Sequence, residues 1–432
     1  MKAVDVLVVG AGPTGLMMAA ELARYGLSFQ IVDKKSGLCK ESRAMAIQAR
    51  TMEVFDHVGI IHRFLDEGIA IRAINPMRRD RPIGRIDFGM LDSEYPFVLS
   101  LEQSKTEAIL LAHLAELKGN VQWETELVSF TQDSQRVEAV LRHLPSGKEE
   151  RMYASWIVGC DGAHSCVRSA MNVSFQGKTF SDLYSLADVQ VRWKYPHAEL
   201  FAFPDAGGIL AAFPMPGKHR YRLIFQLPRC RDLLSKKKAL LPEELAAIAV
   251  PTLSEINATL RKYTATEVEV SDARWITHFH INSRLASSYR EGRLFLAGDA
   301  AHIHSPVGAQ GMNTGLQDAF NLAWKLAFVK RKMAHEMLLD TYQIERHSFG
   351  KELLKRTERA SRMVSLRNPW LASLRNQVLS WLLKSAAVRS KLIQIVSQTA
   401  IRYPQSSIVR RTKLFPGGPQ AGERMPNAPL LH

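Results

Sequence analysis

The stretch Gly10-Ala11-Gly12-Pro13-Thr14-Gly15 decides the fold of this 432-residue chain. It follows an apolar stretch from Val4 to Val9, which has the character of a buried parallel strand. Small and apolar residues at helical spacing continue from Thr14 to Tyr25, and Phe29 to Val32 is typical of a second strand. A G-x-G-x-x-G turn between strand and helix therefore predicts a β-α-β unit that binds a dinucleotide.

Each glycine of this turn is required for a steric reason. Gly10 permits the tight turn, Gly12 lets the backbone approach a pyrophosphate, and Gly15 lets the helix pack closely on the strand. The helix start, which includes Pro13 and Thr14, offers unpaired N–H groups and a partial positive charge to the phosphates.

An acidic residue completes the unit. Asp33 ends the second strand and is followed by Lys34. A carboxylate at this place can accept hydrogen bonds from ribose hydroxyls, and its charge opposes a 2′-phosphate. We therefore include Asp33 and Lys34 in the candidate site, which favours FAD or NAD over NADPH. The turn alone does not separate FAD from NAD.

The composition is that of a globular protein of two or three domains, with 46% hydrophobic and 23% charged residues. No apolar run approaches the roughly 20 residues of a membrane-spanning helix. The N-terminus lacks the pattern of a signal peptide, which predicts a cytoplasmic protein. The four cysteines form no CxxC pair, so neither disulfides nor a zinc site are expected.

Further along the chain, helical patterns cover 43–58, 102–117 and 315–329, and 294–297 has the character of a buried strand. Between 184 and 227, β-branched and aromatic residues alternate with polar ones and are punctuated by Gly and Pro, which predicts an antiparallel sheet. The order indicates a nucleotide-binding α/β domain, interrupted by a sheet and followed by helices.

Three later motifs carry a family resemblance. They are Gly159-Cys160-Asp161-Gly162, Gly298-Asp299-Ala300-Ala301-His302, and the run from Pro306 to Ala319. Together with the glycine turn they resemble the single-component FAD-dependent aromatic hydroxylases, which include the p-hydroxybenzoate, phenol and rifampicin monooxygenases. The resemblance extends from about residue 3 to about residue 430.

The resemblance implies an α/β fold with an α+β insert. A discontinuous Rossmann-like FAD-binding domain would comprise 1–72, 101–177 and 278–355. An inserted antiparallel β-sheet domain for the substrate would comprise 73–100 and 178–277. The remaining 356–432 would form C-terminal helices and a shortened linker, because 422–430 resembles the linker to a third domain in larger members.

The resemblance also assigns further cofactor-binding residues. Asp299 would hold the ribityl hydroxyls, although it can also cap a helix. The loop that starts at Pro306 would present backbone amides to the flavin, which stabilise negative charge on its reduced form. These amides belong to Gly311, Met312 and Asn313. The motif usually has a second glycine where this chain has Ala309, which would be strained at positive φ.

Three more residues are candidates for cofactor binding, and each has an alternative, structural role. Arg43 would reach the pyrophosphate or the flavin face, or lie on the surface. Gln103 would lie near the ribityl chain, or be an ordinary residue at a helix start. Asp161 would bind FAD and NAD(P)H, or simply tie two loops together. His302 and His304 have no third ligand at metal spacing, so no metal is expected.

The chemistry implied is monooxygenation. NAD(P)H would reduce FAD, O2 would form the C4a-hydroperoxyflavin, and one oxygen atom would pass to an aromatic or polyketide-like substrate. The substrate would lie between the flavin and the inserted sheet, with wall candidates Phe201, Phe203, Phe213 and Phe225, each equally explained as sheet core. No protein side chain is an evident nucleophile or base. The alternatives are a flavin reductase or dehydrogenase of the same fold, and a non-catalytic FAD- or ligand-binding protein.

The formal net charge of +15 is concentrated near the C-terminus. From Lys355 to Lys413 there are 13 Lys and Arg against one acid, Glu358. The excess in one segment argues against a nucleic-acid partner. The helices at 356–400 could contact an anionic membrane, or pack on the flavin domain with a basic face in solvent. We favour packing. The oligomeric state is open.

Overall fold

The computed structural model describes residues 2–39, 44–205, 208–226, 248–305, 308–364, 366, 368–409 and 420–425. Within these ranges no helix is long and apolar enough to cross a membrane.

The first sheet is built around the glycine turn. β1 lies between β2 and β12, and β12 also pairs with β19, all in parallel. β10 and β11 extend this sheet beyond β12 as antiparallel neighbours, and β9 pairs with β2. The strands are β1 (Lys2–Val9), β2 (Phe29–Val32), β9 (Val121–Gln122), β10 (Thr125–Gln132), β11 (Val137–His143), β12 (Glu149–Gly159), β18 (Arg290–Glu291) and β19 (Leu294–Leu296).

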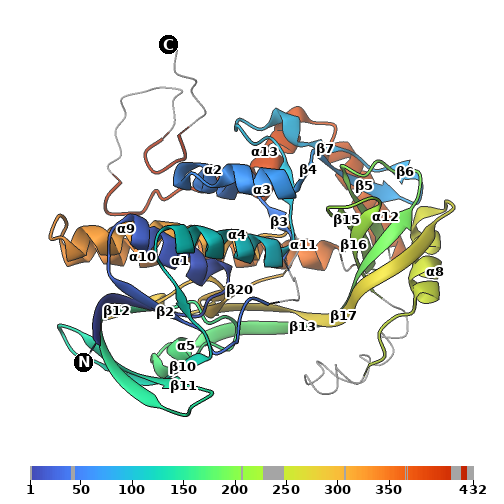
Figure 1. Cartoon of the computed structure of the whole chain (residues 1–432). Coiled ribbons are helices and arrows are strands. Elements are labelled where there is room, and N and C mark those ends of the chain that lie inside the picture. The colour runs from blue at the N-terminus through green and yellow to red at the C-terminus, as the bar shows by residue number, and fades with distance from the viewer. Residues whose placement is uncertain are drawn as a thin grey trace.

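Helices cover one face of this sheet. α1 (Pro13–Arg24) contacts both α4 (Gln103–Glu116) and α9 (Gly311–Lys330), and Figure 1 shows the three as one layer above the strands. Val6 to Val8 and the facing Leu16 to Met18 are fully buried, which places the main core between sheet and helices. The other elements near this core are α2 (Ala49–Val58), α3 (Ile61–Glu67), α5 (Cys166–Ala170), η2 (Gly298–Ala300), η3 (Glu336–Leu339), α10 (Asp340–Tyr342) and η4 (Gln343–His347).

The second sheet is mostly antiparallel, in the order β20-β17-β13-β16-β15-β14-β5-β6, with β7 beside β5. One of its faces packs on α8 (Leu253–Thr264), where a second core forms. The strands are β5 (Ala73–Arg78), β6 (Arg81–Pro82), β7 (Ile86–Asp87), β13 (Phe175–Arg192), β14 (Leu200–Asp205), β15 (Gly208–Pro214), β16 (Arg220–Phe225), β17 (Glu269–Ala286) and β20 (His302–Ile303).

The α/β fold class with an inserted sheet and C-terminal helices is confirmed. The long strands β13 and β17 run across the proposed domain boundaries at 177 and 278, so the exact bounds stay a prediction. Residue 43 lies outside the described residues. Over 44–58, the predicted helix begins too early. Ala46–Ile47 form β3 instead, and α2 starts at Ala49. β3 and β4 (Ile69–Ile71) both pair with β8 (Val98–Ser100), so long-range pairing overrides the local helical pattern.

The C-terminal helices are α11 (Ser348–Val364), α12 (Pro369–Leu382) and α13 (Ala386–Val396). α12 contacts β14, and α13 contacts β7 and the short helix η1 (Phe88–Met90), all in the insert. α11 and the end of α13 reach the first domain: Ser361 Oγ donates to Ser305 Oγ at 2.8 Å, and Ser397 O accepts from Arg50 N at 3.1 Å. The predicted packing of the C-terminal helices on the flavin domain is therefore seen for α11 and the end of α13, whereas α12 packs on β14 of the insert. Its exposed face is apolar.

Candidate functional site

The glycine turn has the geometry that its sequence predicts. Gly10 has φ +100°, and a Cβ there would lie 2.5 Å from Cys160 O. A Cβ on Gly15 would collide with Gly10 O, so the helix and the turn are in direct backbone contact. A Cβ on Gly12 would meet nothing within 4 Å. Since Gly12 also caps α1, its backbone faces the open space at the helix N-terminus, where a pyrophosphate can approach.

Segments far apart in sequence meet at the start of α1. A Cβ on Gly298 would lie 2.5 Å from Thr14 Oγ1, and a Cβ on Gly315 would meet the same hydroxyl. On the other side of the turn, a Cβ on Gly10 would lie 2.8 Å from Asp161 Cα. The structure thus brings the glycine turn, the Asp161 motif and the Asp299 motif together. Their role in cofactor binding stays a proposal.

Asp33 already has two backbone partners. Its Oδ2 accepts from Ala11 N at 2.7 Å and its Oδ1 from Lys35 N at 2.9 Å. These bonds hold the end of β2 against the glycine turn. The carboxylate is half-buried and Lys34 beside it is exposed, so both lie at the rim of the open space.

Asp299 is the exposed residue of a buried segment. Residues 294–298 and 300–302 are buried, whereas the side chain of Asp299 reaches the surface. Gly298 has φ +62°, and this turn aims the following carboxylate away from the core. Strand β19 ends two residues before Gly298, so Asp299 lies at the carboxyl edge of the parallel strands, where open α/β sheets bind ligands.

The start of α9 lies beside this edge. By position, the amides of Gly311, Met312 and Asn313 have no acceptor inside the helix. The Asn313 side chain is fully buried and structural. Its Oδ1 accepts from Gln48 N at 2.8 Å, and its Nδ2 donates to Ala46 O at 2.8 Å. Ala309 has φ +51°, the strained conformation foreseen for the position where the family usually has glycine.

The remaining candidates differ in their placement. Gln103 Oε1 accepts from Ala44 N at 3.1 Å, which ties α4 to the segment before β3. Asp161 Oδ2 accepts from Cys166 N at 2.7 Å and so holds the start of α5. Its buried Oδ1 has no hydrogen-bond partner among the described residues. Arg43 and Pro306 lie outside the described residues.

Sequence reasoning missed a buried ionic network under the site. Asp318, fully buried on α9, accepts from Gly298 N at 3.1 Å, His302 Nε2 at 2.7 Å and Arg346 Nε at 2.6 Å. Burial alone would raise the pKa of Asp318, but the charges of Arg346 and His302 outweigh it and lower the pKa. The network fixes the turn that carries Asp299 to the first turns of α9.

Arg168 was missed as well. Its guanidinium donates to Ala300 O at 2.9 Å and to Ala163 O at 2.8 Å, and it stacks on Phe175 at 3.8 Å from the ring centre. It thereby joins the Asp161 motif to the Asp299 motif. An arginine three residues after Ser165 in a short helix gives no sequence signal for this role, because both acceptors are backbone carbonyls.

The inserted sheet turns one face toward the first domain. Phe213 packs against the first core, and register places it opposite Arg222. Arg222 lies opposite Asp188, which in turn lies opposite Trp275. Residues directly opposite one another share a face, so these four side chains form one row, here called the Phe213 row. Arg222 donates to both oxygens of Asp188 at 2.7 Å, and both are buried.

The other three phenylalanine candidates lie on the opposite face. Phe201, Phe203 and Phe225 are buried in the second core together with Ile256 and Leu260 of α8. Of the four candidates for a substrate wall, only Phe213 faces the first domain.

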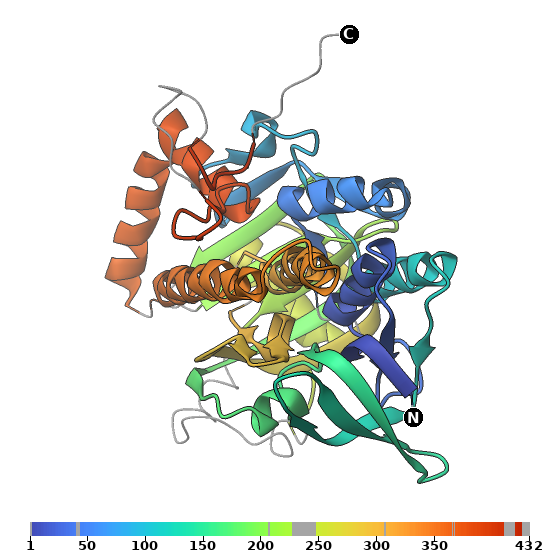
Figure 2. The ribbon, with the colours of Figure 1, turned by 90° about the vertical axis from the view of Figure 1, so that its left-hand side faces the viewer.

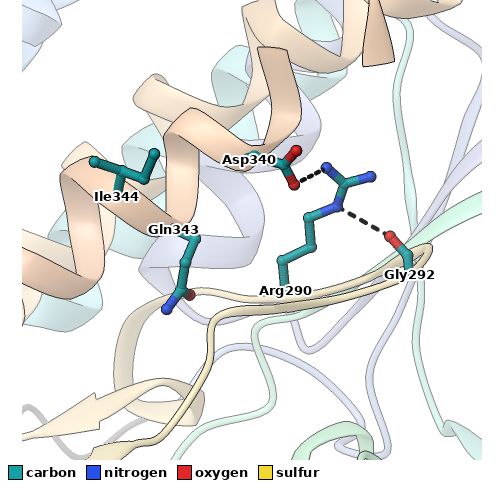
Figure 3. Close-up of a pocket in the computed structure, with 5 residues that line it drawn as sticks. All are labelled: Arg290, Gly292, Asp340, Gln343 and Ile344. Carbon is teal, nitrogen blue, oxygen red and sulfur yellow. Dashed lines mark hydrogen bonds and ion pairs between the residues drawn. The ribbon is translucent and has the colours of Figure 1, made fainter. Parts of the chain in front are cut away.

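A surface hollow lies at a different place, between β18 and the start of η4. Figure 3 shows Arg290, Gly292, Asp340, Gln343 and Ile344 around it. Arg290 Nη1 pairs with Asp340 Oδ1 at 2.6 Å, and Arg290 Nε donates to Gly292 O at 3.1 Å. Gln343 Oε1 accepts from Tyr289 N at 2.6 Å. Because these polar groups are hydrogen-bonded to the protein itself, we assign the hollow a structural role.

The chain is similar to known proteins over most of its length. The family model described as "FAD binding domain" matches residues 3–357. The 6-methylpretetramide 4-monooxygenase of Streptomyces rimosus is 35% identical over 84% of this chain, and the chain covers 63% of that relative's length. The rifampicin monooxygenase of Streptomyces venezuelae is 32% identical, with 92% of this chain and 79% of the relative covered. The solved OxyS anhydrotetracycline hydroxylase of Streptomyces rimosus is 29% identical, with a TM-score of 0.77 over 100% of this chain and 81% of that one.

Proposed function

Because the chain belongs to the FAD binding domain family, we propose that it is an FAD-dependent monooxygenase that uses NAD(P)H and O2 to hydroxylate an aromatic or polyketide-like small molecule. One observation carries the proposal. The glycine turn, the Asp299 motif and the start of α9 meet at Thr14, Gly298 and Gly315, where only glycine fits beside the threonine hydroxyl. The similar monooxygenases support the reaction class.

The residues present fit FAD. The open backbone at Gly12 and the α1 N-terminus suit a pyrophosphate, and the half-buried Asp33 suits a ribose. The exposed Asp299 suits the hydroxyls of a ribityl chain. The α9 amides at Gly311 to Asn313 suit an electron-rich ring edge, because helix N-termini stabilise negative charge.

When bound, FAD would supply the hydride acceptance and oxygen activation that no side chain of this protein can supply. The protein would contribute position and electrostatics. The α9 amides would stabilise negative charge on the ring, while Asp318 and Arg346 would hold those amides in place.

We place the substrate against the Phe213 row. This row faces the first domain, and it combines an apolar ring, a buried Arg222–Asp188 pair and the indole of Trp275. Arg222 lies 5.3 Å from the Trp275 ring centre, so cationic and aromatic surfaces are adjacent. Such a wall suits a flat aromatic molecule that carries hydroxyl or carbonyl oxygens. The use of NAD(P)H and the cytoplasmic location stay predictions.

The decisive experiment combines three measurements on the purified protein. We expect a flavin absorbance spectrum, NADH or NADPH oxidation that is stimulated by a phenolic or polycyclic aromatic compound, and one 18O atom from 18O2 in the product. Coenzyme oxidation without 18O in any product would instead indicate a reductase or dehydrogenase. Tight ligand binding without coenzyme turnover would indicate a non-catalytic binding protein, and a colourless protein that refuses FAD would remove the proposal.

A further inference from the structure

The outer face of α12 is an apolar stripe that nothing among the described residues covers. α12 packs through Ala372 and Asn376, which are buried. At 100° per residue, the five large apolar residues on its other side fall within one sector of about 100°. These residues, here called the α12 stripe, are Trp370 (70% exposed), Leu371 (40%), Leu374 (42%), Val378 (45%) and Trp381 (70%).

The two tryptophans are the strongest part of this observation. The chain has seven tryptophans, and of these only Trp370 and Trp381 are exposed. They lie near opposite ends of a 14-residue helix, which is about 21 Å long. Figure 2 shows α12, the orange-red helix, along the outer edge of the molecule. A large exposed apolar stripe of this kind marks an interaction surface.

Charge identifies the kind of partner. Between Glu358 and Glu423 the sequence has no acidic residue and eleven Lys and Arg. Lys384 is exposed two residues after the end of α12, Lys391 is exposed on α13, and Arg362 is exposed on α11, where it pairs with Glu358 at 3.6 Å. The stripe itself carries no charge, so the surface offers an apolar strip flanked by cations. That combination complements an interface that is both apolar and anionic.

We propose that the α12 stripe docks in the plane of an anionic phospholipid membrane. Tryptophan is enriched at the boundary between lipid head groups and acyl chains, and basic residues beside it attract anionic lipids. A second copy of this chain fits less well, because a symmetric contact through α12 would bring two acid-free basic segments together. The helix is too short to span the bilayer, so the docking is peripheral.

Vesicle co-sedimentation of the full chain tests this. We expect binding to phosphatidylcholine vesicles that contain about one-third phosphatidylglycerol, and little binding to pure phosphatidylcholine. Brominated lipids should quench tryptophan fluorescence on binding. The double variant Trp370→Ser, Trp381→Ser should lower partitioning roughly tenfold or more, because affinity follows buried apolar area.

Three further double variants separate the contribution of charge from that of apolar area. Lys384→Glu with Lys391→Glu should weaken binding to the anionic vesicles, whereas Lys148→Glu with Lys332→Glu, which changes the same net charge elsewhere, should weaken it less. Met333→Ser with Met337→Ser removes two equally exposed apolar residues (65% and 68%) from another place and should leave binding intact. The proposal is overturned by no binding to anionic vesicles, by equal binding of the tryptophan variant, or by self-association that this variant abolishes without any lipid binding.

Discussion

At the scale of single residues, Ala309 shows strain beside a candidate cofactor site. A non-glycine residue at φ +51° destabilises the folded state, because its Cβ comes too close to the backbone. We expect Ala309→Gly to raise the free energy of unfolding by about 1 kcal/mol, measured by urea denaturation. Because the loop leads directly into α9, the same variant should also change the Kd for FAD.

The matched control for this change lies in the insert. Ala265 has the same φ of +51° at the C-terminus of α8, far from the glycine turn. Ala265→Gly should stabilise the protein to a similar extent and leave the Kd for FAD unaltered. An equal effect of both variants on FAD binding would contradict a special role for the Ala309 loop.

His304 gives the protein a pH dependence of known sign. Burial, followed by the charge of the neighbouring His302, lowers the pKa of His304 to about 4 from the ordinary value of 6.5. The unfolded chain therefore binds a proton below pH 6.5 that the folded protein refuses until about pH 4. Stability should fall by about 2 kcal/mol between pH 7 and pH 5 from this residue alone.

Urea denaturation at both pH values measures this. His304→Gln should lose about 2 kcal/mol less than the wild type between pH 7 and pH 5, since glutamine does not titrate. His62→Gln, at an exposed position, should lose as much as the wild type. An unchanged pH dependence in His304→Gln would show that the half-buried imidazole is not responsible.

At the scale of elements, the glycine turn offers a separation of fold from function. Gly12→Ala places a methyl group where nothing lies within 4 Å, so the protein should fold normally but bind FAD at least tenfold more weakly, because the added group fills the space for the pyrophosphate. Gly15→Ala instead drives its methyl group into Gly10 O and should unfold α1 from β1. Thermal unfolding without FAD and fluorescence titration with FAD distinguish the two. Normal FAD affinity in Gly12→Ala would contradict the site.

The two faces of the inserted sheet make a second contrast. Phe203 is 1% exposed in the second core, so Phe203→Ala should cost about 3–5 kcal/mol of stability. Phe213→Ala, on the face toward the first domain, should cost less and should instead raise the KM for the organic substrate severalfold. Steady-state kinetics and denaturation on both variants check this. An unchanged KM in Phe213→Ala would move the substrate away from the Phe213 row.

These elements also show what the sequence could predict. The roles of Gly10 and Gly15 follow from local steric demands, so spacing alone was sufficient. The α9 start and Asp299 needed the family resemblance, because their chemistry lies in backbone direction and exposure. Asp318 could not be foreseen, since its partners His302 and Arg346 lie 16 and 28 residues away and meet it only in the folded protein.

For the C-terminal helices and the inserted sheet, the spacing of apolar residues predicted the type of element but not its orientation. Helical spacing predicted α12, but which side faces solvent depends on its packing against β14. Alternation likewise predicted β14 and β15 but could not say that Phe203 faces α8 while Phe213 faces the first domain.

At the scale of the whole molecule, two hydrophobic cores are joined by two long strands. β13 and β17 pair along both cores, and their register shifts between Thr179 and Leu183. The irregularity separates a part of β13 near the Asp299 motif from a part that belongs to the second core. Proteins open locally in cooperative units that often coincide with supersecondary motifs, so we expect the two parts to open separately.

Hydrogen exchange measured by mass spectrometry with and without FAD tests this division. FAD should slow exchange at 10–15, 298–300 and 311–315, and in β13 before Thr179, because ligand binding stabilises only the unit that it contacts. Exchange in β15 and β16, within the second core, should change little. If FAD protected both sheets equally, the molecule would open as a single unit, and the strand pair β13–β17 would transmit binding across the irregularity. The Gly12→Ala variant supplies the control, since added FAD should then protect neither part at concentrations that saturate the wild type.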